Sequence, residues 1–554
     1  MNKLLATIGF FLVSFTGNSQ NVPFGFSSTL SSVHNLPVTE LATFDHQKLL
    51  AEDTQREKQG GRSNIGRIIP SSTDENEVGN WTTLPNGDRL WQWRFKTANA
   101  KGVSVYFNDL FLPLGSSLVL YPVDKSYFLG PFSNKHCNSH GRFMIGEVVG
   151  DEAILEYYEP AAVVGNAHLG ISGISHLYRY VQQILNEDSD ERGSDECEVD
   201  VNCPEGSQWT NERDGVVRLT ISSGNSVGLC SGSLVNTLAK DCRKYILTAM
   251  HCGEEVSASD WLTCSATFKY QRSACTSGSA PSFYNMVGMF HLADSNDGGG
   301  QTGSDFLLLE LEDPIPVDFN AFFCGWSAET TTPVSGVSIH HPAGDRKKIS
   351  TTEDIISGTY NAIGFHWRVK WMLTETNWGV TEGGSSGSPL FNQDHQLVGT
   401  LTGGLSFCTN QTGPDYYGKM SKHWTSNPNS ADQKLKVWLD PNNTGILSMN
   451  GTYIHAGAAL PCDPGIVGIN EAIQFDDIMI YPSLADQQLT LSSSRYSDVD
   501  FVKVFDNAGK IVTTAQMNNS VQTLNTQQLP AGIYYITFVT KNGSFITKKF
   551  AVSH

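Results

Sequence analysis

Apolar and polar residues alternate in short runs along most of the 554-residue chain, a pattern that is typical of β-strands. Between residues 216 and 405 such runs include VVRLTI, KYILTAM, DFLLLEL and QLVGTLTGG, and no long helical period separates them. Short strands at this frequency predict an all-β sandwich or barrels. The pattern favours a helix in SADQKLKVWLD, residues 430–440, because Leu435, Trp438 and Leu439 share one helical face.

Two further β-patterned regions flank this central part. Residues 21–192 alternate in DRLWQWRFKTANAKGVSVYFNDLFLP, and the charged run NEDSDERGSDECEVD, residues 186–200, spans the end of this region. Crowded charge favours a solvated junction, and the bond Arg192–Gly193 within it is a candidate processing site. Residues 453–475, with Gly, Pro and Ala, have the composition of a linker. Residues 476–554 then show strands around the hairpin signals DNAG and KNG.

The first twenty residues, MNKLLATIGFFLVSFTGNSQ, have the charged start, apolar stretch and small polar end of a secretory signal. A buried N-terminal helix is the alternative. No later apolar run is long enough to span a bilayer. Export would place the eleven cysteines in a compartment that permits disulfides, and their odd number leaves at least one thiol without a partner in the chain.

The net charge of −19 argues against nucleic-acid or anionic-membrane partners, because both usually need a basic face. No C-x-x-C or H-E-x-x-H motif occurs, so neither a metal nor a cofactor is expected. Residues 413–419 spell the start of a P-loop, but Met420 replaces the Ser or Thr that binds magnesium. The histidines of HHPAGDRKK, from His340, are interpreted as structural.

Three short motifs together supply the parts of a serine acyl-transfer site. ILTAMHCG places His251 after a β run, TGSDFLLLEL places Asp305 at the head of a strand, and GGSSGSP places Ser386 in the pattern Gly-x-Ser-Gly-x-Pro. Each motif alone is more often structural than catalytic. In the order His, Asp, Ser, however, they follow the chain order of chymotrypsin-type enzymes.

The segment from Cys197 to about Thr452 resembles the lysyl endopeptidases, a bacterial branch of the trypsin-like serine proteases. CSGSLVN, KYILTAMHCG, GSDFLLLEL, GVTEGGSSGSPLF and YYGKMSKHW carry this resemblance. It implies a mainly β, chymotrypsin-like double β-barrel for residues 193–452. By the same likeness His251 is the general base, Asp305 its orienting acid and Ser386 the nucleophile.

The resemblance also assigns the oxyanion hole to the backbone N–H groups of Gly384 and Ser386. Ser385 stands where many animal trypsin-like enzymes carry an Asp that pairs with a new N-terminal ammonium. Activation is therefore not expected to depend on that ion pair. The family likeness further implies three disulfides: Cys230–Cys252, Cys197–Cys408 and Cys203–Cys275. It assigns no partner to the remaining cysteines, Cys137, Cys242, Cys264, Cys324 and Cys462.

Specificity requires a pocket for the side chain before the cleaved bond. Gly403 and Gly404 have a bare backbone that suits pairing with an extended substrate. Asp415 resembles the pocket acid of the family that selects lysine, and a buried carboxylate needs a cation opposite it. A surface turn is the alternative role for Asp415. The choice of lysine over arginine rests on the resemblance alone, since one carboxylate accepts either.

The region from about Ile478 resembles the C-terminal sorting domain of type IX secretion in the elements YPS, VKVFDNAGKIV, LPAGIYYITFVTKNG and KKFAV. Tyr481–Pro482 lacks the Asn that often follows in this pattern. The resemblance implies recognition by the type IX secretion machinery, with the protein released outside the cell or held at its surface.

These patterns predict a secreted, monomeric serine endopeptidase that cleaves after lysine through an acyl-enzyme. The alternatives are a broader Lys/Arg or different specificity, and an inactive protease-like surface adhesin. Residues 21–192 are expected to be a β-rich propeptide, or else a glycan- or surface-binding module that uses Trp91 and Trp93. Because the base must be neutral, activity is expected to fall below about pH 6.

Overall fold

The computed structural model describes residues 35–58, 60–179, 193–276, 283–425, 430–453, 478–493, 496–507, 510–541 and 545–553. The predicted signal segment at residues 1–20, Arg192 of the candidate processing bond, nearly all of the predicted linker at 453–475, and Cys462 lie outside these ranges.

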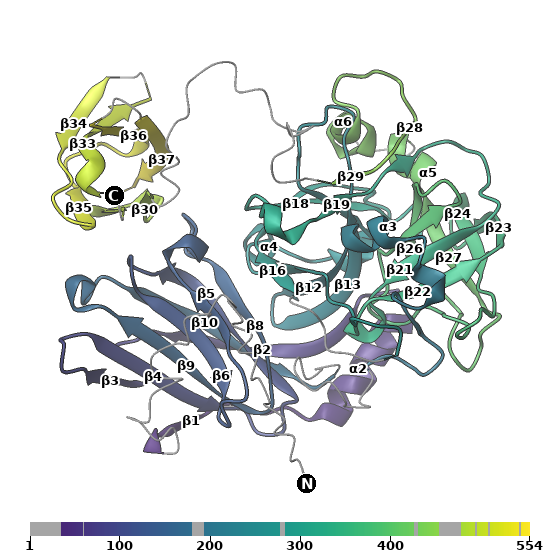
Figure 1. Cartoon of the computed structure of the whole chain (residues 1–554), viewed down its shortest axis with the longest axis horizontal. Coiled ribbons are helices and arrows are strands. Elements are labelled where there is room, and N and C mark those ends of the chain that lie inside the picture. The colour runs from purple at the N-terminus through teal and green to yellow at the C-terminus, as the bar shows by residue number, and fades with distance from the viewer. Residues whose placement is uncertain are drawn as a thin grey trace, which may run out of the picture.

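Residues 35–179 form a sandwich of two β-sheets (Figure 1). One sheet has the order β1-β4-β9-β6-β7, with β3 paired to β4. Its strands are β1 (Val38–Glu40), β3 (Asn80–Thr83), β4 (Arg89–Lys96), β6 (Ser117–Pro122), β7 (Leu129–Phe132) and β9 (Glu152–Glu159). The other sheet has the order β2-β10-β5-β8, with β2 (Ser63–Thr73), β5 (Gly102–Phe111), β8 (Phe143–Val149) and β10 (His168–Leu177). Trp91 and Trp93 are buried in the core between the sheets, so neither ring is exposed to bind a glycan.

Helix α2 (His46–Lys58) precedes β2, and the hydrophobic pattern did not predict it, because only Leu49 and Asp53 are buried on it. The carboxylate of Asp53 accepts hydrogen bonds from Asn64 and Arg67, at 3.1 and 2.9 Å. Gly60, at φ 86°, ends the helix with its N–H on the Glu57 carbonyl. A polar network of tertiary contacts therefore holds this helix.

The first barrel has the strand order β16-β15-β12-β13-β14-β18-β17. These strands are β12 (Val216–Ser223), β13 (Ser226–Leu234), β14 (Tyr245–Thr248), β15 (Ser265–Phe268), β16 (Tyr284–Val287), β17 (Met289–Asp294) and β18 (Leu307–Leu311). Leu219, Ile246 and Leu309 lie in its core.

The second barrel has the order β11-β22-β21-β25-β26-β27-β24-β23, with β20 paired to β26 and β28. These strands are β11 (Val199–Asp200), β20 (Trp326–Ser327), β21 (Gly336–His340), β22 (Lys348–Thr352), β23 (Asp354–Thr359), β24 (Ile363–Lys370), β25 (Pro389–Asn392), β26 (Leu397–Gly404), β27 (Pro414–Lys419) and β28 (Ser448–Met449). Residues 414–419 of the P-loop-like motif thus form a strand.

Short elements complete these two barrels. They are α3 (Thr210–Gly215), α4 (Ala258–Trp261), α5 (Met420–Thr425), α6 (Leu435–Leu439) and the strand pair β19 (Phe322–Phe323) and β29 (Thr452–Tyr453). Of the predicted helix at 430–440, residues 435–439 form α6, which buries Leu435 and Leu439, and residues 431–433 form a 3-10 turn.

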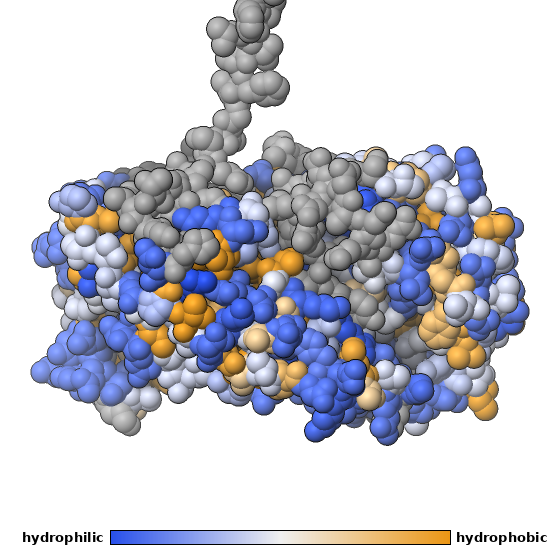
Figure 2. All heavy atoms as spheres, turned by 90° about the horizontal axis from the view of Figure 1, so that it is seen from below, coloured by the Kyte–Doolittle hydropathy of each residue, from blue (hydrophilic) through white to orange (hydrophobic). Residues whose placement is uncertain are grey.

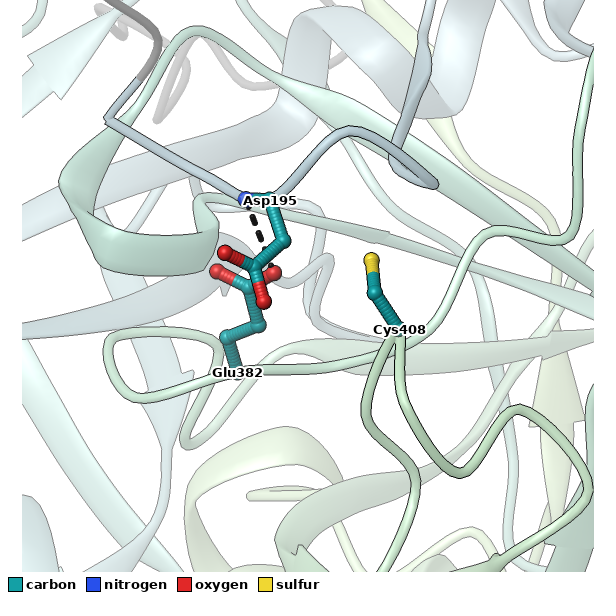
Figure 3. Close-up of side chains that lie close together, drawn as sticks. All are labelled: Asp195, Glu382 and Cys408. Carbon is teal, nitrogen blue, oxygen red and sulfur yellow. Dashed lines mark hydrogen bonds between the residues drawn. The ribbon is translucent and has the colours of Figure 1, made fainter.

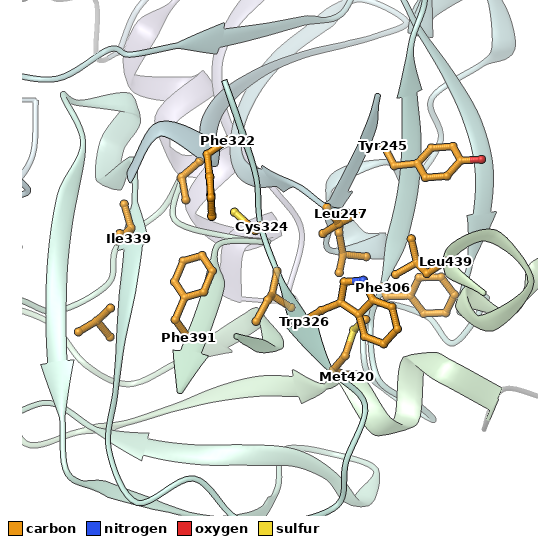
Figure 4. Packing of buried hydrophobic residues seen from close by; sticks show 14 of the residues in the cluster. Tyr245, Leu247, Phe306, Phe322, Cys324, Trp326, Ile339, Phe391, Met420 and Leu439 are labelled. Carbon is orange, nitrogen blue, oxygen red and sulfur yellow. The ribbon is translucent and has the colours of Figure 1, made fainter. Parts of the chain in front are cut away.

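One apolar cluster contains residues of both barrels (Figure 4). Leu247 of β14 and Phe306 just before β18 come from the first barrel, and Ile339 of β21 and Phe391 of β25 come from the second. Trp326 is fully buried among them, and its Nε1–H donates to the Asn236 carbonyl at 2.8 Å. This cluster fixes the position of one barrel against the other.

The N-terminal sandwich and the first barrel share one continuous sheet, because β2 pairs with β13. In Figure 1, β2 and α2 accordingly reach from the sandwich to the side of the barrels. The face in Figure 2 is largely hydrophilic, with small apolar areas between polar ones.

Residues 478–553 form a separate β unit with its own core, which includes Leu491, Val502 and Ile536. Its strands are β30 (Met479–Tyr481), β31 (Leu484–Ala485), β32 (Gln488–Ser492), β33 (Val499–Asp506), β34 (Ile511–Ala515), β35 (Val521–Asn525), β36 (Gly532–Thr540) and β37 (Phe545–Val552). No helix in the described ranges is long and apolar enough to cross a membrane. The prediction of a mainly β chain with two barrels is confirmed.

Replacing Trp326 with Ala is expected to destabilise the protein by about 3 to 5 kcal/mol, because it opens a cavity in the cluster shared by the barrels. The midpoint of urea unfolding, followed by near-ultraviolet circular dichroism, measures this loss. Val334, which is 71% exposed, is the control, and Val334→Ala is expected to change stability by no more than about 0.5 kcal/mol. Equal midpoints for both variants would contradict the prediction.

Candidate active site

His251 follows β14 in a short 3-10 turn, Met250–Cys252, and its side chain is only 3% exposed. Its Nδ1 lies 2.7 Å from Oδ2 of Asp305. Its backbone N–H donates to the other carboxylate oxygen, Oδ1, at 3.0 Å. The Asp305 carboxylate therefore fixes both the ring and the backbone of His251, which leaves Nε2 as the nitrogen free to exchange a proton with a substrate or nucleophile.

Asp305 is itself held by a second carboxylate that the sequence motifs did not point to. Its backbone adopts φ 59°, and its N–H donates to Oδ2 of Asp297 at 2.8 Å. The other oxygen of Asp297 accepts the N–H of Gly300 at 3.0 Å. A Cβ on Gly299, which has φ 67°, would lie 2.9 Å from the His251 Cβ. The run Asp297–Gly300 thus packs closely over the His–Asp pair.

The pKa of His251 is raised above its usual value. Burial acts against this by disfavouring the charged ring, but the charge of Asp305 and its hydrogen bond to the ring outweigh burial. The protonated ring of His251 is therefore stabilised at this position. A general base requires this, because it holds a proton briefly during the reaction.

Ser386 comes from the second barrel, just before β25, and its loop is bound to the first. The Ser231 N–H donates to the Ser386 carbonyl at 2.8 Å, and Ser231 Oγ donates to the Gly384 carbonyl at 2.9 Å. Among the described residues, the N–H groups of Gly384 and Ser386 have no hydrogen-bond partner. No hydrogen bond among the described residues joins Ser386 Oγ to His251 Nε2. Such contacts often tighten only when substrate binds.

The three serines of this loop differ in burial. Ser385 and Ser388 are fully buried, whereas Ser386 is partly exposed. Ser385 Oγ lies 2.8 Å from Nδ1 of His340, and Ser388 Oγ lies 3.2 Å from that of Ser338. Of the three hydroxyls, that of Ser386 is therefore the one open to a substrate.

His340 and His341, the tandem pair interpreted as structural, are both fully buried. Burial lowers the pKa of His340 to about 3, and the pKa of His341 is also well below its usual value for the same reason. Both rings are thus neutral at physiological pH. Ser385 therefore contacts an uncharged partner through its side chain.

The structure contains the disulfides Cys197–Cys408, Cys203–Cys275 and Cys230–Cys252. The third joins β13 to the residue directly after His251. Cys137, Cys264 and Cys324 are free thiols. Asp195, Glu382 and Cys408 bring three ligand-type side chains together (Figure 3), but the Cys408 sulfur is bonded to Cys197 and so is not a thiolate that a metal would take.

Asp415 is fully buried on β27 and accepts four hydrogen bonds. Its Oδ2 accepts from Trp371 Nε1 at 2.6 Å, Thr381 Oγ1 at 2.8 Å and Ser406 Oγ at 2.6 Å. Its Oδ1 accepts the Ser406 N–H at 3.2 Å. Burial raises the pKa of Asp415, although these hydrogen bonds oppose the rise. No ion pair to Asp415 occurs within the described ranges.

Gly403 and Gly404 lie on β26 beside this carboxylate, with Gly404 opposite Asp415 and Gly403 opposite Tyr416. A Cβ on Gly404 would lie 1.9 Å from Asp415 Oδ1, so only glycine fits there. The structure thus brings Gly404 and Asp415 into contact. It also assembles His251 with Asp305, and Gly384 with Ser386, at the junction of the barrels.

Comparison with known proteins identifies the family of this chain. The model of the lysyl endopeptidase C-terminal domain matches residues 192–418. A lysyl endopeptidase of Pseudomonas aeruginosa is 30% identical over 386 residues, covering 66% of this chain and 80% of that protein. The chain belongs to the lysyl endopeptidase family. It is a serine endopeptidase, and the resemblance predicted from its sequence motifs is confirmed.

The model of a secretion system C-terminal sorting domain matches residues 479–553, which confirms the predicted type IX sorting domain. The protein is thus secreted or held at the cell surface. An endo-acting ulvan lyase of Formosa agariphila is 24% identical over 254 residues, or 41% of this chain and 48% of that protein.

Two solved structures are similar to part of the chain. The protease Anisep of Arthrobacter nicotinovorans has 17% identity and a TM-score of 0.28, covering 38% of this chain and 91% of that one. The MamO protease domain of Magnetospirillum magneticum has 14% identity and a TM-score of 0.25, covering 38% and 94%. At such TM-scores we draw no conclusion from either.

Ser386→Ala is expected to abolish peptide hydrolysis and labelling by a fluorophosphonate probe, with a loss in kcat of about 10⁶-fold. Ser385→Ala removes two buried contacts of the hydroxyl, to His340 and to the Glu382 N–H, and this matched variant is expected to keep labelling at Ser386. Mass spectrometry of the labelled peptide identifies the modified serine. Labelling of Ser386→Ala at either neighbouring serine would contradict the assignment.

The pH dependence of kcat/KM is expected to show an acid limb above pH 6.5, the usual pKa of histidine. Only neutral His251 accepts a proton, and its pKa is raised, so activity is lost as pH falls through that raised value. Asp305→Asn removes the charge that raises it and is expected to move the limb to lower pH while kcat drops about 10⁴-fold. A wild-type limb at or below pH 6 would show that Asp305 does not act on His251 in this way.

Proposed function

We propose that this protein cleaves peptide bonds on the carboxyl side of lysine, with Ser386 as nucleophile, His251 as general base and Asp305 as its orienting acid. Ser386 Oγ attacks the carbonyl carbon while His251 Nε2 takes its proton. His251 then returns that proton to the leaving amine, and water hydrolyses the acyl-enzyme by the same steps in reverse order.

The backbone amides of Gly384 and Ser386 are proposed to stabilise the oxyanion of each tetrahedral intermediate. Both lack a partner among the described residues, and φ 95° at Gly384 is the backbone conformation that turns this loop. Donors that are already in place cost no reorganisation when negative charge develops. The half-exposed backbone of Gly403 and Gly404 is proposed to pair with the substrate residues before the cleaved bond.

The observation that carries lysine specificity is the buried carboxylate of Asp415, whose hydrogen bonds all come from neutral groups. A buried carboxylate is costly without a cation, and a substrate side chain is the cation that this site lacks. Oδ2 already accepts three donors, and Oδ1 faces Gly404. A guanidinium fork needs two free oxygens, whereas an ammonium also binds through the hydroxyls of Thr381 and Ser406. This arrangement favours lysine over arginine.

We further propose that the functional units follow the predicted boundaries. Residues 1–20 are the signal, 21–192 the propeptide, 193–452 the protease, 453–475 the linker and 476–554 the sorting domain. Both catalytic loops come from one chain, which fits a monomeric enzyme. The secretion machinery is the partner that the sorting domain addresses.

Peptides that end in Lys, Arg, Glu or Leu before the cleaved bond are expected to be hydrolysed with a strong preference for Lys. Asp415→Ser and the near-isosteric Asp415→Asn are expected to lower kcat/KM for the Lys peptide by about 10²- to 10³-fold, since each leaves the ammonium buried without its counter-charge. Asp394→Ser, at an exposed turn, is the control and should leave the preference unchanged. Equal cleavage of all four peptides by the wild type would refute this specificity.

A further inference from the structure

A short segment of the N-terminal region lies across both catalytic loops. The side chain of Arg62 is buried, with 1% of the residue exposed. Its Nη1 donates to the carbonyls of Cys252 and Glu254, at 3.2 and 3.1 Å, and its Nη2 donates to Ser226 Oγ at 3.2 Å. Cys252 directly follows His251. The guanidinium thus occupies a site built beside the general base.

The next residue of this segment reaches the other catalytic loop. A Cβ on Gly383 would lie 2.9 Å from Ser63 Oγ, and Gly383 directly precedes the oxyanion residue Gly384. The Ser63 hydroxyl is fixed in turn, because it donates to Glu57 of α2 at 3.0 Å. Residues 62 and 63 therefore bridge the loops of His251 and Ser386.

The pairing of β2 with β13 sets the direction in which this segment runs. Ser63 pairs with Leu229, Asn64 with Gly228 and Arg67 with Ser226. Leu229 adjoins Cys230, whose disulfide reaches Cys252, so Ser63 is the paired residue nearest the catalytic loops. Later residues run away from the site along β13. A substrate can pair with this edge of β13 in the same direction as β2. The substrate residues that follow the cleaved bond then lie along β13.

The groups around the Arg62 side chain suit a guanidinium. Its acceptors are two carbonyl oxygens and one hydroxyl, and the charges of Glu254 and Glu255 support the cation. A Cβ on Gly228 would lie 2.8 Å from the Arg62 Cδ, so the absence of a side chain there makes room for the arginine. Burial lowers the pKa of Arg62 to about 10, which leaves the group charged at neutral pH.

The chain before Arg62 differs from a substrate. Gly61 donates its N–H to the Arg56 carbonyl at 3.0 Å, so it belongs to the end of α2. A glycine has no side chain to reach Asp415. The segment therefore offers an arginine to the site beside His251 but no lysine to the specificity pocket, and it can stay bound without being cut.

We propose that the carbonyls of Cys252 and Glu254, with Ser226 Oγ, form a subsite for the side chain that directly follows the cleaved bond, and that this subsite selects arginine. In the intact chain Arg62 fills it. The inference rests on the proposed function and extends it: the preferred substrates carry the sequence Lys-Arg, and the bond between these two residues is hydrolysed.

The test uses the protein purified from the culture medium, with active sites counted by fluorophosphonate titration. Three quenched fluorescent peptides differ only in the residue after a single Lys, which is Arg, Ala or Glu. We expect kcat/KM to be about tenfold higher for Lys-Arg than for Lys-Ala, as hydrogen bonds to a charged group allow, and lowest for Lys-Glu. Mass spectrometry of the products confirms that the cut falls between Lys and Arg.

Two variants probe the subsite directly. Gly228→Val fills the space over which the arginine lies, and Ser226→Ala removes one acceptor, so both are expected to lower the Lys-Arg to Lys-Ala ratio, Gly228→Val to about one. Ser259→Ala is the matched control, since its hydroxyl bonds to Ser257 instead, and it should keep the wild-type ratio. If Gly228→Val is not labelled by the probe, Ser226→Ala and the wild-type peptides decide.

The outcomes separate the two proposals. Equal cleavage of the three peptides after Lys overturns the arginine subsite and leaves the lysine specificity standing. Failure to cut any of them after Lys, by protein that the probe labels, overturns the proposed function and the subsite together.

Discussion

Two β-barrels share one apolar cluster, and the distances within the active site depend on it. Leu247 shortly before His251, Phe306 directly after Asp305 and Phe391 shortly after Ser386 all belong to that cluster. Each segment of the proposed triad therefore starts from, or leads into, a buried residue of the cluster. Since interiors are close-packed and deform little, the cluster fixes where the polar side chains of these three segments lie.

Hydrogen bonds between the barrels add a second, polar constraint. Ser231 of β13 bonds to the carbonyls of both Gly384 and Ser386, and the Cys230–Cys252 disulfide joins the same strand to the histidine turn. One strand thus positions the proposed base and the proposed oxyanion loop together. This strand is also the one with which the N-terminal region pairs, so the region docks at the strand that holds both loops.

The parts that sequence alone predicts are those with a local signature. Alternating strands, the motifs around His251, Asp305 and Ser386, and the sorting-domain hairpins each lie within a short run of residues. Asp297, the donors Trp371 and Ser406 around Asp415, and the site of Arg62 have no such signature, because each depends on contacts between segments that are distant in sequence. Helix α2 escaped prediction for a related reason: its stability comes from the buried Asp53 network and hardly from an apolar face.

The continuous sheet across β2 and β13 affects how the chain can associate with other strands before and after export. A strand at the rim of a sheet exposes unpaired N–H and C=O groups, which recruit other strands and promote aggregation. In the intact chain β2 covers the rim at β13. Wherever the N-terminal region departs, that rim is left bare beside the active site, and an extended peptide can then add to it as a new strand. The N-terminal region thereby prevents self-association at the same strand to which a substrate peptide would bind in the free enzyme.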